Sequence, residues 1–265
     1  MSKLGIDVSY HNGVINWKEV KDSNIDFVII RAGYGRSNVD EQFENNVKGC
    51  IKYGIPFGVY WFIYGINEDE AIQNAEMFHQ TIAPYKDNIV MKAWSDFEYD
   101  TDANARKRGA ALTRDMRTKM VIAFLERMKQ YGYEVGNYAN PDYLNTKFND
   151  LSQYPLWLAK YSSNKGNYEC EIWQYSSKGS VPGIKGNVDM NHYYGEFEAA
   201  KVTYYNTPEF TLIDSLNKIG VDSSYKYRKL IAAANGIENY SGTADQNLEM
   251  LRLLNEGKLT KVLTD

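Results

Sequence analysis

The first 198 residues alternate short apolar runs with segments whose apolar residues recur at helical spacing. Strand-like runs are expected at eight places, residues 4–9, 27–32, 56–62, 89–97, 135–138, 156–161, 172–175 and 188–191. Helical patterns separate the early strands, at residues 41–53, 68–81 and 113–131. This alternation is typical of a mostly parallel α/β sheet or barrel.

The later strands of this segment have no long helical pattern between them. Eight strands with helices concentrated in the first part predict a TIM-like barrel that loses its outer helices in its last third. Such a barrel also explains how eight strands fit into about 200 residues, the lower end of the usual range.

After residue 198 the pattern changes. Residues 199–209 are weakly patterned and contain Pro208, so we expect a linker there. Residues 210–265 predict a small all-α domain with helices at 210–219, 223–235 and 243–255, each followed by a glycine. Its expected core is Leu212, Ile213, Leu216, Leu230, Ile231, Leu248, Leu251 and Leu254. At about 55 residues the domain is near the lower limit for independent folding, so we expect it to lean on the first domain or on another copy of itself.

Composition excludes several classes of function. A net charge of −4 gives no basic excess for nucleic acid, and no apolar run is long enough for membrane insertion. Two cysteines and three scattered histidines argue against a metal site, and we expect no cofactor. The aromatic content, 14% of the chain, is the conspicuous feature, and aromatic faces without positive charge are typical of sugar-binding clefts.

The segment from Trp94 to Asp100 carries the sharpest chemical signal. Asp96 and Glu98 are two residues apart at the end of an apolar strand, so they share a face with Cα atoms roughly 6.6 Å apart. Two carboxyl groups so placed at the rim of a barrel cannot ionise independently, and one tends to stay protonated as glycosidic hydrolysis requires. The alternative is a solvated acidic loop, since further acids follow.

Two more acids fall in the first and last predicted strands. Asp7 ends the first strand and Asp189 lies in the last. First and last strands are neighbours in a closed barrel, so both acids are expected near Asp96 and Glu98 on one rim. A structural role for Asp7, capping the turn that follows it, stays open.

Together these stretches resemble glycoside hydrolase family 25, the lysozymes (N-acetylmuramidases) common in bacteriophage endolysins. The resemblance covers residues 4–197 and rests on the order and spacing of GIDVS at 5–9, RAGYG at 31–35, GVYWF at 58–62, DFE at 96–98, PLWLA at 155–159, IWQY at 172–175 and GIKGNVD at 183–189. It implies a modified barrel of five β/α units and three plain strands, (β/α)5(β)3. Ser95 and Phe97 depart from the aliphatic residues usual at their positions, which affects packing rather than chemistry.

The resemblance implies hydrolysis of the β-1,4 bond between N-acetylmuramic acid and N-acetylglucosamine in peptidoglycan. It implies that Glu98 is the general acid, with Asp7 and Asp189 also in the site. Asp96 could orient the 2-acetamido group of the substrate for internal attack, stabilise the oxocarbenium charge or activate water. We favour the substrate-assisted role, and the backbone spacing alone does not decide it.

Aromatic residues at the ends of predicted strands are candidates for sugar contact. They are Tyr34, Tyr60, Phe62, Tyr138, Trp157 and Trp173, and Gln174 adds a neutral amide for hydroxyl or acetamido groups. For each aromatic residue alone, burial in the core is the alternative.

The C-terminal segment resembles a small helical repeat found at the ends of Gram-positive cell-wall hydrolases, which implies wall binding; the alternative is a domain that only stabilises or dimerises the enzyme. The N-terminus lacks a secretory signal, so we expect an endolysin that stays in the host cytoplasm until lysis and then acts on the bacterial cell wall. A non-catalytic glycan-binding protein and a chitinase-like enzyme are the rival interpretations.

Overall fold

The computed structural model describes residues 2–196 and 211–262. Its contacts divide the chain into two compact units, Met1–Lys201 and Val202–Asp265. The linker expected at residues 199–209 lies outside the described residues. Each unit is therefore described by itself.

The first unit is built on one closed sheet. Its strands are β1 Lys3–Val8, β2 Phe27–Tyr34, β3 Asn38–Val39, β4 Phe57–Phe62, β5 Ala93–Asp96, β6 Val135–Ala139, β7 Leu156–Ala159, β8 Ile172–Gly179 and β9 Val188–Tyr193. Their order is β1-β9-β8-β7-β6-β5-β4-β2-β3, and a further pairing of β1 with β2 closes the barrel. Neighbouring strands from β1 through β2, β4, β5, β6 and β7 to β8 are parallel, whereas β9 runs antiparallel to both β8 and β1. The predicted eight-stranded barrel is confirmed.

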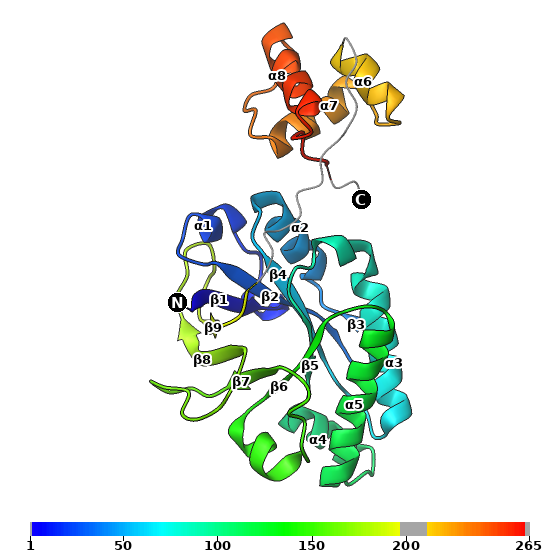
Figure 1. Cartoon of the computed structure of the whole chain (residues 1–265), viewed down its shortest axis with the longest axis vertical. Coiled ribbons are helices and arrows are strands. Elements are labelled where there is room, and N and C mark those ends of the chain that lie inside the picture. The colour runs from blue at the N-terminus through cyan, green and yellow to red at the C-terminus, as the bar shows by residue number, and fades with distance from the viewer. Residues whose placement is uncertain (1, 197–210, 263–265) are drawn as a thin grey trace. The chain divides into compact units, whose positions relative to one another are not determined.

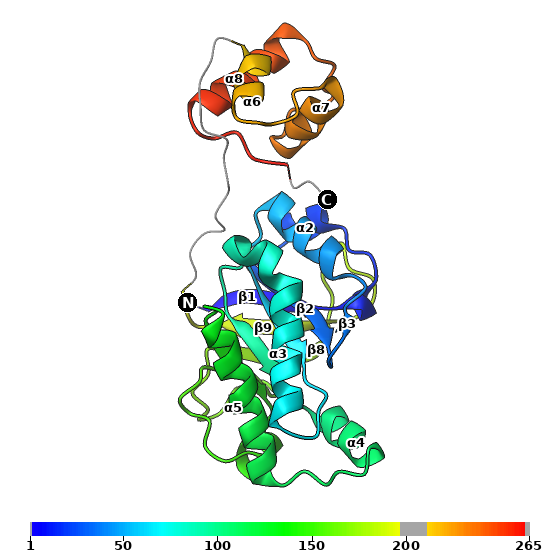
Figure 2. The same ribbon diagram turned by 90° about the vertical axis from the view of Figure 1, so that its right-hand side faces the viewer.

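Helices cover the outside of the first half of the barrel (Figure 1). They are α1 Trp17–Lys21, α2 Phe43–Tyr53, α3 Glu68–Ile82 and α5 Arg114–Gln130, whereas α4 Tyr99–Lys107 lies at one end of the barrel. The long helices α3 and α5 lie side by side along one flank of the barrel (Figure 2). Between β6 and β7 the described chain forms only a π-helical turn, Tyr143–Lys147, and no α-helix lies between β7 and β9. This asymmetry agrees with the helix-poor last third of the pattern.

Three local features differ from the expectation. The strand expected at residues 89–97 is shorter in the structure: a 3-10 segment, Ala83–Asn88, precedes it, and only β5, Ala93–Asp96, is a strand. Helix α4 follows at once, so the chain after Glu98 is helical and the acidic-loop alternative for it is wrong. The two-residue strand β3 forms a hairpin with the end of β2 that the pattern did not indicate.

Large aromatic and aliphatic side chains fill the interior of the barrel below the carboxyl ends of its parallel strands. One buried cluster contains Phe27, Ile29, Trp94, Tyr138, Trp157, Ala159, Ile172 and Tyr193. Glycines on adjacent strands make room for the largest rings: a Cβ on Gly5 would lie 2.3 Å from the Phe27 ring, and one on Gly136 would lie 2.2 Å from the Trp94 ring. Small residues beside large ones thus fill the interior with side chains rather than leaving a pore.

The second unit is a three-helix domain, with α6 Leu212–Lys218, α7 Tyr225–Ala234 and α8 Ala244–Asn255. Its buried core is Leu212, Leu216, Ile231, Ala232, Tyr240, Met250, Leu254 and Leu259. The prediction that Ile213, Leu230 and Leu248 belong to this core is wrong, because these side chains are 44%, 47% and 61% exposed. The helices turn their other faces inward, and Tyr240 and Met250 fill the core.

Candidate active site

A polar layer closes the barrel above its apolar interior. Ile29 and Trp94 point into the barrel, so Arg31 and Asp96, two residues further along the same strands, point inward one layer higher. Gln174 stands in the same relation to Ile172 on β8. Because these strands are parallel, the upper layer lies at their carboxyl ends, where barrel enzymes hold their catalytic groups.

The structure brings the four predicted acids to this rim. Asp7, near the end of β1, pairs in register with Asp189 on β9. Since β9 is antiparallel to β1, the start of β9 reaches the same edge as the end of β1. Asp96 is the last residue of β5, and Glu98 caps the N-terminus of α4.

Two amides hold Asp7. The Nε2 of Gln174 and the Nδ2 of Asn191 both donate to Asp7 Oδ2, each at 2.8 Å. Burial nevertheless raises the pKa of Asp7 to about 8, and the charge of Asp189 adds to this rise. Burial also raises the pKa of Asp189, to about 6.

Asp96 and Glu98 form the second pair of acids. Burial, followed by the charges of Glu98 and Asp7, raises the pKa of Asp96 well above its ordinary value. Burial raises the pKa of Glu98 as well, while its interactions with Tyr138 and Asp96 oppose that rise. The pair therefore retains a proton at pH values where isolated carboxyl groups have lost theirs. One protonated acid beside another acid can supply a proton to a leaving group.

Three of the predicted aromatic residues border this layer. Tyr34, Tyr60 and Phe62 are half-buried on β2 and β4. Tyr34 reaches the inner face because the register of β2 shifts between Arg31 and Gly33, a bulge that re-aims the residues after it. Tyr138 is only 7% exposed, and its hydroxyl donates to Gln174 Oε1 at 3.0 Å.

The two predicted tryptophan contacts are wrong. Trp157 is 1% exposed inside the barrel, where its Nε1 donates to Asn191 Oδ1 at 2.8 Å. Trp173 lies between the inward-facing residues Ile172 and Gln174, so the pleat turns its ring to the outer face, against His192. Neither ring can offer a face to a sugar in the barrel mouth.

Gln174 also differs from its predicted role as a free amide. Its Nε2 binds Asp7, and its Oε1 accepts hydrogen bonds from the hydroxyls of Tyr138 and Tyr161, at 3.0 and 3.1 Å. The side chain is 3% exposed. It joins residues of the site to one another.

A buried ion pair in this layer was not anticipated. Arg31 Nε donates to Asp40 Oδ2 at 2.7 Å, and both side chains are nearly inaccessible. A second guanidinium nitrogen, Arg31 Nη2, is buried without a hydrogen-bond partner among the described residues, as is Asp96 Oδ1. Tyr10 and Tyr34, whose rings face the Arg31 guanidinium, line a hollow of about 350 Å³. The sequence feature that could have indicated this ion pair is a charged residue, Arg31, at an inward-facing position of a predicted strand.

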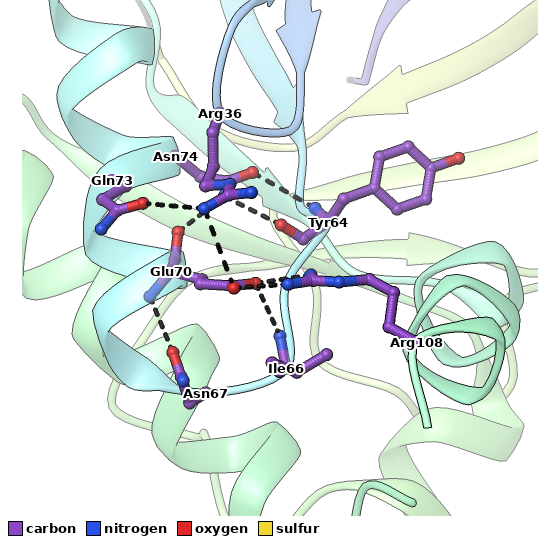
Figure 3. A network of polar contacts seen from close by, with 8 residues as sticks. All are labelled: Arg36, Tyr64, Ile66, Asn67, Glu70, Gln73, Asn74 and Arg108. Atoms are coloured by element: carbon purple, nitrogen blue, oxygen red, sulfur yellow. Dashed lines mark hydrogen bonds and ion pairs between the residues drawn. The ribbon is translucent and has the colours of Figure 1, made fainter. Parts of the chain in front are cut away.

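A polar network fixes the loop after β4 at the rim (Figure 3). Asn74 on α3 accepts from the backbone N–H of Tyr64 at 3.2 Å and donates to its carbonyl at 3.0 Å. Glu70 binds the guanidinium of Arg108 through both carboxylate oxygens, at 2.5 and 2.6 Å, and accepts from the Ile66 N–H. Tyr64, which packs edge-on against Tyr34 at 6.1 Å, is thereby held beside the predicted aromatic residues.

Within residues 2–196 and 211–262, no group of three His, Cys, Asp or Glu side chains could hold a metal ion. Over the same part of the chain, no helix is both long and apolar enough to cross a membrane.

Comparison with known proteins identifies relatives of the first unit. The model of glycosyl hydrolases family 25 matches residues 6–184. Lysozyme M1 of Streptomyces globisporus is 30% identical over 202 residues, which are 72% of this chain and 67% of the relative. The autolysin LytC of Streptococcus pneumoniae, solved in complex with a synthetic peptidoglycan ligand, shares 32% identity and a TM-score of 0.65 over 73% of this chain and 47% of its own. The chain thus spans between about half and two thirds of the length of these relatives.

One further similarity is short. A stretch of 53 residues, 20% of this chain, is 47% identical to part of the L-alanyl-D-glutamate peptidase of Listeria phage A118. It covers 19% of that protein.

Proposed function

Because the chain belongs to glycosyl hydrolase family 25, we propose that it hydrolyses the β-1,4 bond between N-acetylmuramic acid and N-acetylglucosamine in peptidoglycan. The observation that carries this proposal is the meeting of two acid pairs, Asp7 with Asp189 and Asp96 with Glu98, at the carboxyl ends of the barrel strands. Lysozyme M1 and the ligand-bound LytC are relatives whose names point to the same substrate.

Glu98 is the proton donor in this proposal. It is the more accessible acid of its pair, because Asp96 is 6% exposed and lies at the end of β5, whereas Glu98 is half-buried and caps α4 on the rim. A glycosidic oxygen above the barrel therefore reaches Glu98 first. Burial raises its pKa, which favours the protonated form needed to assist departure of the leaving sugar.

Asp96 acts deeper in the site. We assign it to the 2-acetamido group of the substrate, whose N–H its carboxylate accepts while the acetamido carbonyl attacks the anomeric carbon. An early NMR reading of the product anomer tests this assignment, because retention is expected and an inverted product overturns it.

The activity itself is tested with one conservative variant. Glu98→Gln keeps the size of the side chain but has no proton to give, so release of reducing ends from purified peptidoglycan should fall at least about a hundredfold. Near wild-type clearing would refute the proposal. Running the same assay on chitin oligomers separates a muramidase from a chitinase-like enzyme, since only the former acts on peptidoglycan in preference to chitin.

We further propose that the second unit binds the cell wall and that the enzyme acts as an endolysin. The 53-residue stretch shared with a phage peptidase has the length of the described part of the second unit, residues 211–262. Enzymes that cut different bonds have no reason to share a catalytic segment of that size, but they can share a targeting module. Full-length Glu98→Gln should therefore sediment with purified sacculi, and the same variant ending at residue 201 should not. Equal sedimentation would contradict the wall-binding role.

If the enzyme is an endolysin, lysis should begin only when the cell membrane becomes permeable to it. Enzyme made inside a susceptible bacterium should stay in the cytoplasm without effect until the membrane is permeabilised and should then lyse the cell wall. Lysis without permeabilisation would exclude this localisation.

A further inference from the structure

The amide of Gln174 connects two sides of the barrel mouth. It donates from Nε2 to Asp7 on β1 and accepts at Oε1 from Tyr138 on β6 and from Tyr161 beyond the end of β7. All three distances lie between 2.8 and 3.1 Å, and the amide itself is buried. A single side chain thus fixes one acid and two phenols.

The chemistry of these partners requires an amide at this position. A carboxylate such as Asp7 can only accept a hydrogen bond when ionised, so it needs the NH2 group, while the two phenol hydroxyls donate to the carbonyl oxygen. A carboxyl group at position 174 could serve the phenols but would meet Asp7 as a second acid. These partners therefore fix the orientation of the Gln174 amide. Its carbonyl oxygen already accepts two hydrogen bonds and has no acceptor position left.

Tyr161 has an exposed ring and a hydroxyl group that reaches the buried acid site. The residue is 58% exposed, yet its hydroxyl ends at a buried amide that also holds Asp7. The ring therefore extends from the surface into the acid site with its hydroxyl end fixed and its body open to solvent. A rigid exposed ring loses little conformational freedom when a sugar packs against it, and aromatic faces pair well with the apolar faces of sugars.

We propose that Tyr161 is a substrate-binding residue whose ring packs against a sugar of the glycan chain, and that Gln174 is the positioning residue that holds this ring in register with Asp7. The inference deepens the proposed function and depends on it for the identity of the glycan. It assigns the contact to a residue outside the strands, in place of Trp157 and Trp173, which the barrel buries.

Binding measured without turnover tests the Tyr161 part. Full-length Glu98→Gln is titrated by calorimetry with a soluble peptidoglycan fragment of defined length, alone and combined with Tyr161→Phe or Tyr161→Ala. Loss of the hydroxyl anchor should weaken binding about threefold to tenfold, and loss of the ring by at least about tenfold. The melting temperature should hardly change, because the ring is exposed.

The matched control is Tyr194→Ala. Tyr194 is 44% exposed and lies just beyond the other end of β9, at the opposite end of the barrel. Its removal should leave the dissociation constant unchanged. An unchanged constant for Tyr161→Ala, or an equal loss for Tyr194→Ala, overturns the proposal.

The pH profile of kcat/KM tests the positioning role of Gln174. In Gln174→Glu the new carboxyl group and Asp7 must share a proton, so the active form is lost as pH rises and the optimum should move to lower pH. Gln174→Met, which forms a hydrogen bond with none of the three partners, should lose activity without that movement. A uniform loss in Gln174→Glu at every pH, accompanied by a lowered melting temperature, would show a merely structural role and overturn the inference.

The two proposals fail in different ways. If the unmodified chain releases no reducing ends from peptidoglycan, the proposed function fails. The effect of Tyr161→Ala on fragment binding is read on the inactive variant and so does not depend on that result.

Discussion

Replacing Asp7 with asparagine removes its ionisable carboxyl group, and this change should stabilise the barrel at neutral pH. Burial and the charge of Asp189 raise the pKa of Asp7 from 3.8 to about 8. Between these two values the folded chain keeps a proton that the unfolded chain has lost. The free energy of unfolding therefore falls as pH rises through this window.

The magnitude follows from the width of the window. About three pKa units lie between the unfolded value of 3.8 and pH 7, and each unit corresponds to about 1.4 kcal/mol, so Asp7 costs at most about 4 kcal/mol at pH 7. At pH 4 it costs almost nothing. In Asp7→Asn the side-chain oxygen still accepts from Gln174 and Asn191, so the hydrogen bonds survive without the charge.

Tryptophan fluorescence during urea denaturation at pH 4 and pH 7 measures the effect. All five tryptophans precede residue 198, so the signal reports the barrel and not the second unit. The gain from Asp7→Asn should approach 4 kcal/mol at pH 7 and vanish at pH 4. The matched control is Asp150→Asn. Asp150 is an exposed acid whose pKa is lowered by a hydrogen bond donated by the backbone N–H of Ser152, so its replacement should bring no gain at pH 7. An equal effect of Asp7→Asn at both pH values, or a loss at pH 7, would refute the reasoning.

Three further predictions concern the supports of the site. Asp40→Asn leaves the buried Arg31 guanidinium without its counter-charge and should lower the free energy of unfolding by about 3–5 kcal/mol; a loss below about 1 kcal/mol in urea denaturation would contradict this. Asn74→Ala strands the backbone N–H and C=O of Tyr64 and should cost about 2–4 kcal/mol, together with weaker fragment binding by calorimetry; unchanged binding would mean that the loop keeps its position without the network. Gly136→Ala drives a methyl group to 2.2 Å from the Trp94 ring and should cost about 1–3 kcal/mol or more in thermal melts, whereas an unchanged melting temperature would show that the ring can move aside.

Hydrophobic alternation was sufficient to predict the barrel and the approach of its acids. Asp7 and Asp96 stood out because ionisable groups in apolar strands are costly to bury, and closure of the sheet then requires the first and last strands to meet. The pattern could not show how far below the rim each inward-facing side chain lies. Trp157 and Gln174 both face inward, but only the register of neighbouring strands shows that Trp157 lies a layer below the rim.

Other features depend on local signals that compete. A solvated acidic loop after Glu98 was the alternative to the paired acids, yet acids in the first turn favour a helix by interacting with its positive end, and Glu98 caps it. The bulge that turns Tyr34 inward leaves no mark in the hydrophobic pattern, since Ala32 and Gly33 fit either register. The ion pair of Arg31 with Asp40 depends on a hairpin that follows the strand and so could not be inferred from the strand alone.

The change from an apolar to a polar interior within one step along the strands explains how stability and chemistry coexist in this barrel. Trp94 and Trp157 supply buried apolar area and rigidity in the lower layer. Asp96, two residues after Trp94 on the same strand, lies directly above this rigid layer with little access to water. The same burial that raises the pKa of Asp96 also makes its ionised form unfavourable, so the acids oppose folding where they serve catalysis. A variant that removes the acid and gains stability is therefore the expected signature of an active site, and a neutral or destabilising result would instead mark the acid as structural.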